Sequence, residues 1–215
     1  MHELTDDSLL PKNRLETLTD GIFAITMTLI ILDLKTPENI PYNLAEIELP
    51  EILINLLPSI EAYAVSFIIL GVFWLRHQIQ FKYIRSTNRM LLSVNMIFLL
   101  LIGFVPFTVG IMMRYPLIVL PFRIYVINLI LISIVMTYQW MLIGRSKKIS
   151  AMDISPKRRR RFLILTSIPI FIFILSYLIS FINLRAAFFI IYLDPIFYLV
   201  YRLFLRRNTQ DEAGV

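Results

Sequence analysis

The sequence predicts an all-α integral membrane protein in which six transmembrane helices form one domain, residues 1–215. Of the 215 residues, 58% are hydrophobic and only 17% are charged, whereas a soluble domain carries about a quarter charged residues. Long apolar stretches alternate with short polar ones, and a spanning helix needs about 20 apolar residues. We expect helices at about 14–34, 53–81, 90–113, 116–143, 162–184 and 186–204.

The first of these helices has an unusually short apolar stretch. Gly21–Leu34 has 14 residues, which rise only about 21 Å against a hydrocarbon core of about 30 Å. To span, the helix must continue back through Asp20, Glu16 and Arg14. Ionisable groups are costly against lipid, so we expect this helix to be enclosed by protein or to face water.

Lys and Arg residues indicate the orientation, because cytoplasmic loops of membrane proteins carry the excess of positive charge. With both termini in the cytoplasm, the inner segments hold 17 of the 21 Lys and Arg residues, and the outer segments hold only Lys35, Arg114, Arg123 and Arg185. We therefore expect a multi-pass protein of the cell membrane with cytoplasmic N- and C-termini.

Two polar segments lie outside the apolar stretches. Lys35–Glu51 contains three prolines and four glutamates, which predicts an irregular, acidic external lip. On the inner side, the basic run Lys157–Arg161 follows Ser155-Pro156. We interpret the run as a topology anchor that contacts anionic lipid headgroups. Nucleic-acid binding by this run is the minor alternative. We do not expect it, because so short a run beside the membrane is not part of a nucleic-acid-binding fold.

Three further polar groups interrupt the apolar stretches. For Glu61 and Arg123, toward the outer side, we expect boundary snorkelling or a mutual pair rather than a transport site. Asp194-Pro195 falls inside the last helix, where proline loosens the backbone hydrogen bonding and predicts a kink. Asp194 needs a partner, for which Arg123 and Arg185 are the candidates.

The composition argues against cofactor and metal chemistry. Cysteine is absent and the chain has two histidines, so a zinc site within one chain is improbable. The apolar stretches offer almost none of the converging acids and bases that catalysis needs. We therefore expect no enzymatic activity and no cofactor.

Within the first helix, Ile25, Leu29 and Leu32 share one face, with Thr28 beside them. An apolar stripe of this kind is usually ordinary packing. However, the same helix carries small and hydroxyl residues that allow close helix approach, and its inner end carries an acid and a base that need partners.

This helix resembles the first helix of the transmembrane-protein-175 family of potassium channels in its prokaryotic single-repeat form. The family pattern is Arg, three residues, an aromatic, Ser, Asp, three residues and Ala; the matching positions are Arg14, Leu18, Thr19, Asp20 and Ala24. Phe73-Trp74-Leu75-Arg76-His77 supports the resemblance, and Asn95 is a weaker match. Leu18-Thr19 replaces the usual Phe-Ser, and Gln78 stands where many members have a second histidine.

The resemblance implies a homotetramer whose central pore is lined by the first helix of each subunit. It implies hydrophobic rings in place of a carbonyl-lined filter: Ile25, Leu29 and Leu32, with the Thr28 hydroxyl beside the innermost constriction. In the expected topology, an inner polar cluster also lies near the cytoplasmic face, and we favour a static clamp between helices over a role in gating for it: Arg14, Thr19, Asp20, Trp74 and His77.

Together these features predict a passive, potassium-permeable cation channel with modest preference for K⁺ over Na⁺. A narrow apolar ring makes an ion shed hydration water without offering oxygen ligands in its place. The free-energy cost of this dehydration is lower for K⁺ than for Na⁺. The alternative is a secondary transporter or proton-coupled carrier. Such a carrier needs a midplane site with ionisable groups and broken helices, and only Asp194-Pro195 hints at one.

Overall fold

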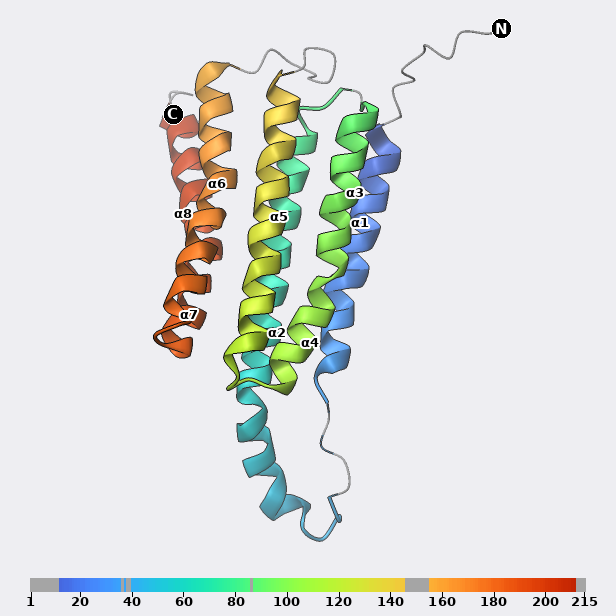
Figure 1. Ribbon diagram of the computed structural model, residues 1–215, viewed down its shortest axis with the longest axis vertical. Coiled ribbons are helices and arrows are strands. Elements are labelled where there is room, and N and C mark those ends of the chain that lie inside the picture. Colours follow the sequence, from blue (N-terminus) through green and yellow to red (C-terminus); the bar gives the residue numbers. More distant parts are fainter. Residues whose placement is uncertain (1–11, 36, 38–39, 86, 146–154, 212–215) are drawn as a thin grey trace, which may run out of the picture.

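The computed structural model describes residues 12–35, 37, 40–85, 87–145 and 155–211. Figure 1 shows a bundle of roughly parallel helices. Six stretches are long and apolar enough to cross a membrane, which confirms the six-helix prediction: Lys12–Asp33, Ala45–Phe81, Arg89–Arg114, Val119–Arg145, Pro156–Ile179 and Leu184–Leu203.

The first spanning stretch consists of α1 (Lys12–Leu29) and a 3₁₀ turn, η1 (Ile30–Asp33). It runs back through Asp20, Glu16 and Arg14, as the short apolar stretch predicted. α1 packs on α2 (Ala45–Phe81), α3 (Arg89–Gly103) and α4 (Val105–Arg114). Its Phe23 is buried in the main core with Ile69, Phe73 and Phe98.

α2 begins eight residues before the predicted start, so residues 45–51 are helical rather than part of an irregular lip. Glu46 and Glu48 occupy its first turn, where negative charge interacts favourably with the helix dipole. Its 37 residues rise about 55 Å, and the excess length projects beyond the other helices (Figure 1).

Two of the spanning stretches are each broken into two helices. α3 and α4 meet at Phe104, just before Pro106. The last stretch consists of α7 (Leu184–Ile191) and α8 (Leu193–Asp211), which meet at Tyr192. Pro195 has no N–H to donate to the carbonyl of Ile191, four residues earlier, so the break confirms the predicted kink.

The remaining two stretches are single helices, α5 (Val119–Arg145) and α6 (Pro156–Ile179). α5 packs against α3, α4 and α6, and α6 packs against α7 and α8. α6 begins six residues before the predicted start because Ser155 caps it and Pro156 occupies its first turn. The basic run Lys157–Arg161 therefore forms the first turns of a helix.

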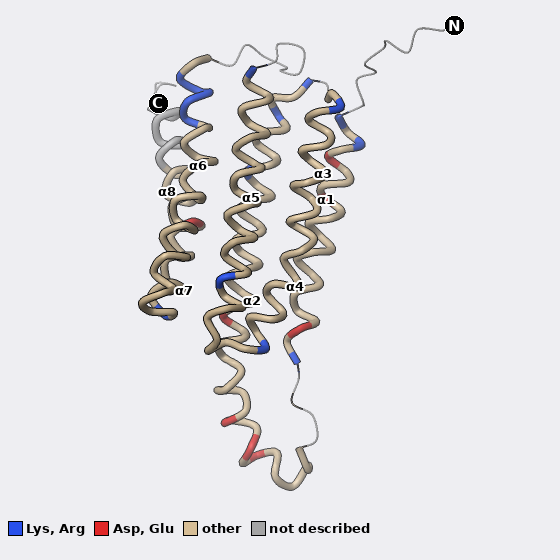
Figure 2. The backbone as a smooth tube through the Cα atoms, viewed as in Figure 1, with Lys and Arg blue, Asp and Glu red and all other residues tan. Residues whose placement is uncertain are grey.

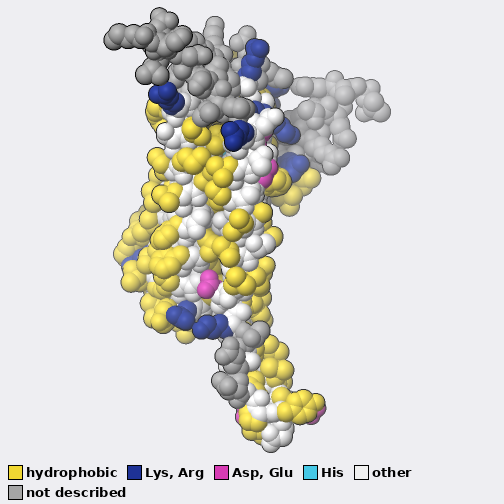
Figure 3. All heavy atoms as spheres, turned by 90° about the vertical axis from the view of Figure 1, so that its right-hand side faces the viewer, with side chains coloured by type: hydrophobic (Ala, Val, Ile, Leu, Met, Phe, Trp, Pro, Cys, Tyr) yellow, Lys and Arg dark blue, Asp and Glu magenta, His cyan; other side chains and the backbone are white. Residues whose placement is uncertain are grey.

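Charged residues separate the two ends of the bundle. Figure 2 shows Lys and Arg concentrated at the end where α1 and α6 begin and α5 ends. We call this the basic end; it carries Lys12, Arg14, Arg85, Arg89, Arg145 and Lys157–Arg161. The opposite end, with Asp33, Glu46, Glu48 and Glu51, is called the acidic end. Between them, the face in Figure 3 carries hydrophobic side chains interspersed with uncharged surface, and few charged side chains.

Candidate functional site

One face of α1 and η1 has no cover within its own subunit. Ile25 is 59% exposed, Leu29 43% and Leu32 74%, whereas Phe23 and Ile30 on the opposite side are 1% or less exposed. Thr28 is also exposed. We call Ile25, Thr28, Leu29 and Leu32 the uncovered face. Because this stripe is not packed against the subunit's other helices, it is free to face another subunit, lipid or water.

Thr28 keeps its hydroxyl close to the helix. Its Oγ1 donates to the carbonyl oxygens of Ala24 and Ile25, each at 2.9 Å. The single hydroxyl hydrogen is thereby used locally, but the oxygen lone pairs remain available to accept a hydrogen bond or to contact a cation.

Asp20 ties α1 to α2. Trp74 Nε1 donates to Asp20 Oδ1 at 2.8 Å, and Gln78 Nε2 donates to the same oxygen. Trp74 and Gln78 are one helical turn apart on α2, so both donors reach one carboxylate. An acid that would be costly against lipid therefore has two partners at its place in the bundle.

Thr19 joins α1 to a second, buried set of polar groups. Asn95 Nδ2 of α3 donates to Thr19 Oγ1 at 3.3 Å. Asn95 Oδ1 lies 2.9 Å from His77 Nε2 and accepts from Gln139 Nε2 of α5 at 3.0 Å. His77 is 1% exposed and stacks on Phe81 and Phe98. Four helices thus meet at one network of side-chain hydrogen bonds.

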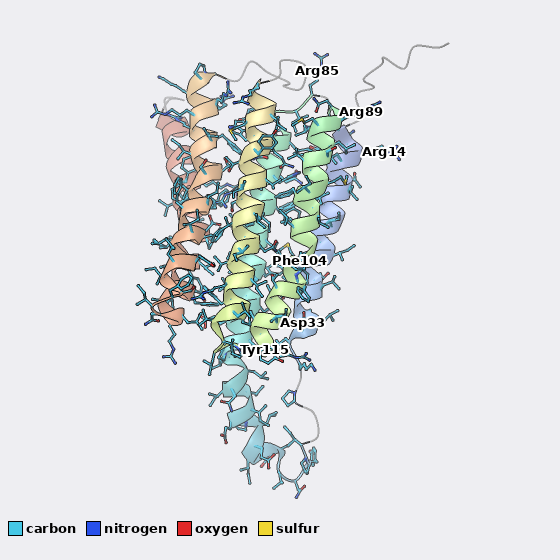
Figure 4. The ribbon with its side chains drawn as sticks, in the orientation of Figure 1. Arg14, Asp33, Arg85, Arg89, Phe104 and Tyr115 are labelled. Atoms are coloured by element: carbon cyan, nitrogen blue, oxygen red, sulfur yellow. The ribbon has the colours of Figure 1, made fainter. Side chains whose placement is uncertain are left out.

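The structure brings four of the five residues predicted for the inner polar cluster into these two networks: Thr19, Asp20, Trp74 and His77. Arg14 is exposed and has no hydrogen bond or ion pair within the described part of the chain. Figure 4 shows its side chain directed away from the bundle. Because Arg14, Gly21 and Ile25 follow one another at i, i+7 and i+11, Arg14 lies above the uncovered face instead.

Three members of the networks were not among the predicted site residues: Gln78, Asn95 and Gln139. Asn95 and Gln139 each interrupt a long apolar stretch, and a polar side chain inside a spanning helix is itself a sign of an interhelical partner. Gln78 follows Trp74 by four residues, which puts it on the same helix face.

At the acidic end, α1 is held against α4. The Asp33 carboxylate lies directly over Gly110, and a β-carbon added to this glycine would come within 2.6 Å of Asp33 Oδ2. Figure 4 shows Asp33 and Tyr115 at this end, opposite to Arg85 and Arg89. Only glycine leaves room for the carboxylate here.

The polar pairs proposed for the outer groups are wrong. Asp194 pairs neither with Arg123 nor with Arg185 but with Arg76 of α2, through two hydrogen bonds of 2.7 and 3.0 Å, and both side chains are 0% exposed. Arg123 bonds Ser180 and lies 3.6 Å from the Phe181 ring centroid. Glu61 instead accepts from the Tyr192 hydroxyl at 2.7 Å.

Asp194 does not pair with Arg123 or Arg185 because these side chains lie at different depths along the bundle. Arg123 and Arg185 lie within the first turns of α5 and α7, near the acidic end, whereas Asp194 lies about two and a half turns further along the last stretch. Arg76, five residues before the end of α2, reaches the same level from the other direction. It is thus buried inside the protein rather than part of the exposed basic end.

Comparison with known proteins gives consistent results. The sequence profile of a family described as endosomal/lysosomal potassium channel TMEM175 matches residues 14–106. A potassium channel of Streptomyces collinus is 34% identical over 106 residues, which cover 47% of this chain and 48% of that relative. A potassium channel of Chamaesiphon minutus is 33% identical over 103 residues, 47% of this chain and 49% of the relative. The chain therefore matches about half the length of these curated relatives.

Among solved structures, a crystal structure titled as a lysosomal potassium-selective channel TMEM175 homolog from Chamaesiphon minutus has the same fold. The TM-score is 0.73 at 23% identity, over 88% of this chain and 97% of that chain. The fold and the site together define a six-helix integral membrane protein whose N-terminal helix keeps one free face. The matched segment contains α1, α2 and most of the polar network. Over residues 14–106, the chain is similar in sequence to the TMEM175 family.

Proposed function

We propose that the chain is one subunit of a potassium-permeable cation channel, in which α1 from four copies surrounds a shared axis. The observation that carries the proposal is the uncovered face, which remains free although α1 packs on three other helices. Two bacterial relatives that match about half of the chain are named potassium channels. Permeation is passive, so the protein catalyses no reaction and uses no cofactor.

The constriction in this proposal consists of rings of Ile25, Leu29 and Leu32, one residue from each subunit. An apolar ring only slightly wider than a bare ion removes hydration water without offering oxygen ligands, and it can also dewet and close the path. K⁺ sheds its water at lower cost than Na⁺. The resulting preference for K⁺ is modest, with the Thr28 oxygen as the nearest polar group.

The polar cluster has a positioning role in this mechanism. Its hydrogen bonds link α1 to α2 through Asp20 and to α3 through Thr19. Two attachments on different sides of one helix fix its rotation, and this rotation decides which side chains face the axis. We favour a static clamp; movement of this contact during gating is the alternative.

The basic end of the bundle faces the cytoplasm in this proposal, in the cell membrane. The excess of Lys and Arg there supports this orientation. The acidic end then faces outward, where Glu46, Glu48 and Glu51 raise the local concentration of cations.

A secondary transporter is the second candidate. In the sequence, only Asp194-Pro195 indicated a transport site within the membrane. In the structure, both oxygens of the Asp194 carboxylate are paired with Arg76. A buried, fully paired carboxylate offers no free site for a coupling ion, so this observation favours the channel.

The test is flux through the purified chain in liposomes with a K⁺ gradient and no gradient of Na⁺ or H⁺. The proposal expects K⁺ to move down its gradient until the membrane potential opposes it, with protein-free liposomes as the control. Strict dependence of K⁺ movement on an imposed proton or Na⁺ gradient would support a coupled carrier instead.

A further inference from the structure

A cavity of about 460 Å³ opens at the basic end, between α2, α6 and α8. Most of its lining comes from α6 and α8, which lie across the bundle from α1 (Figure 1). The cavity is within the range of small-molecule sites, about 300–1,000 Å³. Neither the uncovered face nor the polar cluster contributes to its lining.

Four cationic side chains line this cavity: Lys157, Arg158, Arg161 and Arg202. No Asp or Glu is among the described residues that line it. The positions 157, 158 and 161 share one face of α6. Arg159 lies instead over Gly144 of α5, and Arg160 does not line the cavity. The basic run is thus divided between this cavity and other surfaces.

Tyr198 forms a buried polar part of the same lining. The residue is only 5% exposed, and its hydroxyl has no hydrogen bond of good geometry among the described residues, although the Arg202 side chain lies within interaction range. Its ring lies 5.3 Å from the guanidinium carbon of Arg76, whose charge Asp194 balances. A ligand oxygen that accepts from this hydroxyl gives a buried donor a well-placed partner.

The wall also combines polar and apolar surface. α6 begins at Pro156 with Ser155 as its cap, so the positive end of its dipole lies at the cationic rim. Ile79, Phe162 and Leu165 supply apolar surface in the same cavity. A cationic rim next to apolar side chains, at the end of membrane-spanning helices, matches the headgroup and first acyl carbons of a lipid.

From these contacts we infer that the cavity binds the phosphate group of an acidic phospholipid. Arg158, Arg161 and Arg202 bind the phosphate oxygens, and the Tyr198 hydroxyl donates to one of them. The acyl chains leave along the apolar wall. This site is more specific than a general attraction of the basic run to anionic headgroups, because it uses some of its cations and not others.

The experiment measures lipid binding to the purified full chain in neutral detergent by native mass spectrometry. The probes are phosphatidic acid, phosphatidylcholine and the soluble sn-glycerol 3-phosphate. We expect phosphatidic acid to bind in preference to both. The double variant Arg161→Gln/Arg202→Gln should weaken phosphatidic acid binding about tenfold or more, because it removes two charge-assisted hydrogen bonds.

The matched control is Arg85→Gln/Arg160→Gln, which also removes two charges from the basic end and should change binding by less than about threefold. Tyr198→Phe should weaken binding without lowering the thermal stability of the lipid-free protein. Equal losses in the two double variants would overturn the site in favour of nonspecific attraction. Equal affinity for phosphatidic acid and glycerol 3-phosphate would overturn the proposal that the ligand is a lipid, and would indicate a soluble phosphate ligand instead.

Discussion

Leu29 is the single residue on which the filter mechanism depends most. It is apolar, 43% exposed and central to the uncovered face. Leu29→Ala should widen the ring, let ions keep more water and so reduce the K⁺-over-Na⁺ permeability ratio. Reversal potentials under bi-ionic conditions measure this ratio, and Ile25→Ala should act in the same direction.

Ile164→Ala is the matched control for Leu29→Ala. Ile164 is similarly exposed, at 45%, but it belongs to α6, which does not form the uncovered face. Its truncation should leave the permeability ratio unchanged. If Leu29→Ala and Ile25→Ala both carry normal currents with an unchanged K⁺-over-Na⁺ permeability ratio, the uncovered face does not form the filter.

Asp194 is the residue whose loss should cost the most stability. Asp194→Asn leaves the Arg76 guanidinium buried without a counter-charge, and breaking a buried pair costs roughly 3–5 kcal/mol. We expect a clear fall in the unfolding temperature in detergent. Replacing both partners, Arg76→Met/Asp194→Leu, should recover much of it.

Glu61→Gln provides the comparison for Asp194→Asn, because Glu61 is an exposed acid with one hydrogen bond, from Tyr192. It should change the unfolding temperature little. Equal effects of the two amide substitutions would mean that the Arg76 pair contributes nothing particular to stability.

Sequence reasoning identified the residue types at the site better than their partners. The composition of α1 and its resemblance to a known family predicted Thr19, Asp20, Trp74 and His77 as one cluster. In the structure Asp20 bonds Trp74, whereas Asn95 joins Thr19 to His77 in a separate network. Sequence reasoning misplaced Arg14 and the partner of Asp194, because partner choice depends on the depth at which distant helices meet. One sequence contains no direct record of that depth.

At the scale of the helices, α1 depends on Asp20 for its attachment to α2. Asp20→Ala removes the acceptor of both Trp74 and Gln78. We expect faster hydrogen exchange in α1 and a smaller fraction of assembled oligomer, measured by exchange mass spectrometry and size-exclusion light scattering.

Thr17→Ala is the control for Asp20→Ala. Thr17 is exposed on α1, and among the described residues its hydroxyl bonds only to the carbonyl of Asn13 in the same helix. Its loss should leave both readouts unchanged. Normal oligomers and unaltered exchange in Asp20→Ala would make the clamp dispensable.

The sequence predicted the existence of each spanning helix but not all of its ends. Apolar length and the hydrophobic run mark the part inside a membrane. The extensions outside it follow from local chemistry: acids in the first turn of α2, and the Ser155 cap with Pro156 for α6. The α7–α8 break was predictable because proline removes one defined hydrogen bond.

At the scale of the whole molecule, the six-span topology follows from apolar length and from the distribution of Lys and Arg, and the structure confirms the six spans. Neither the apolar lengths nor the distribution of Lys and Arg predicted where α1 packs. It lies against α2, α3 and α4 rather than in the centre of its own bundle. That arrangement leaves the uncovered face free. Because this face is free, several copies of the chain can bring their α1 helices together around a shared axis.

The most direct test of that shared axis is disulfide cross-linking, since the natural chain has no cysteine. Leu32→Cys places one thiol on the uncovered face, and Phe171→Cys places one on α6 at a similarly exposed site, 69% against 74%. If α1 lines a central axis, mild oxidation in membranes cross-links Leu32→Cys into dimers and leaves Phe171→Cys monomeric. Cross-links from Phe171→Cys with none from Leu32→Cys would contradict the channel architecture.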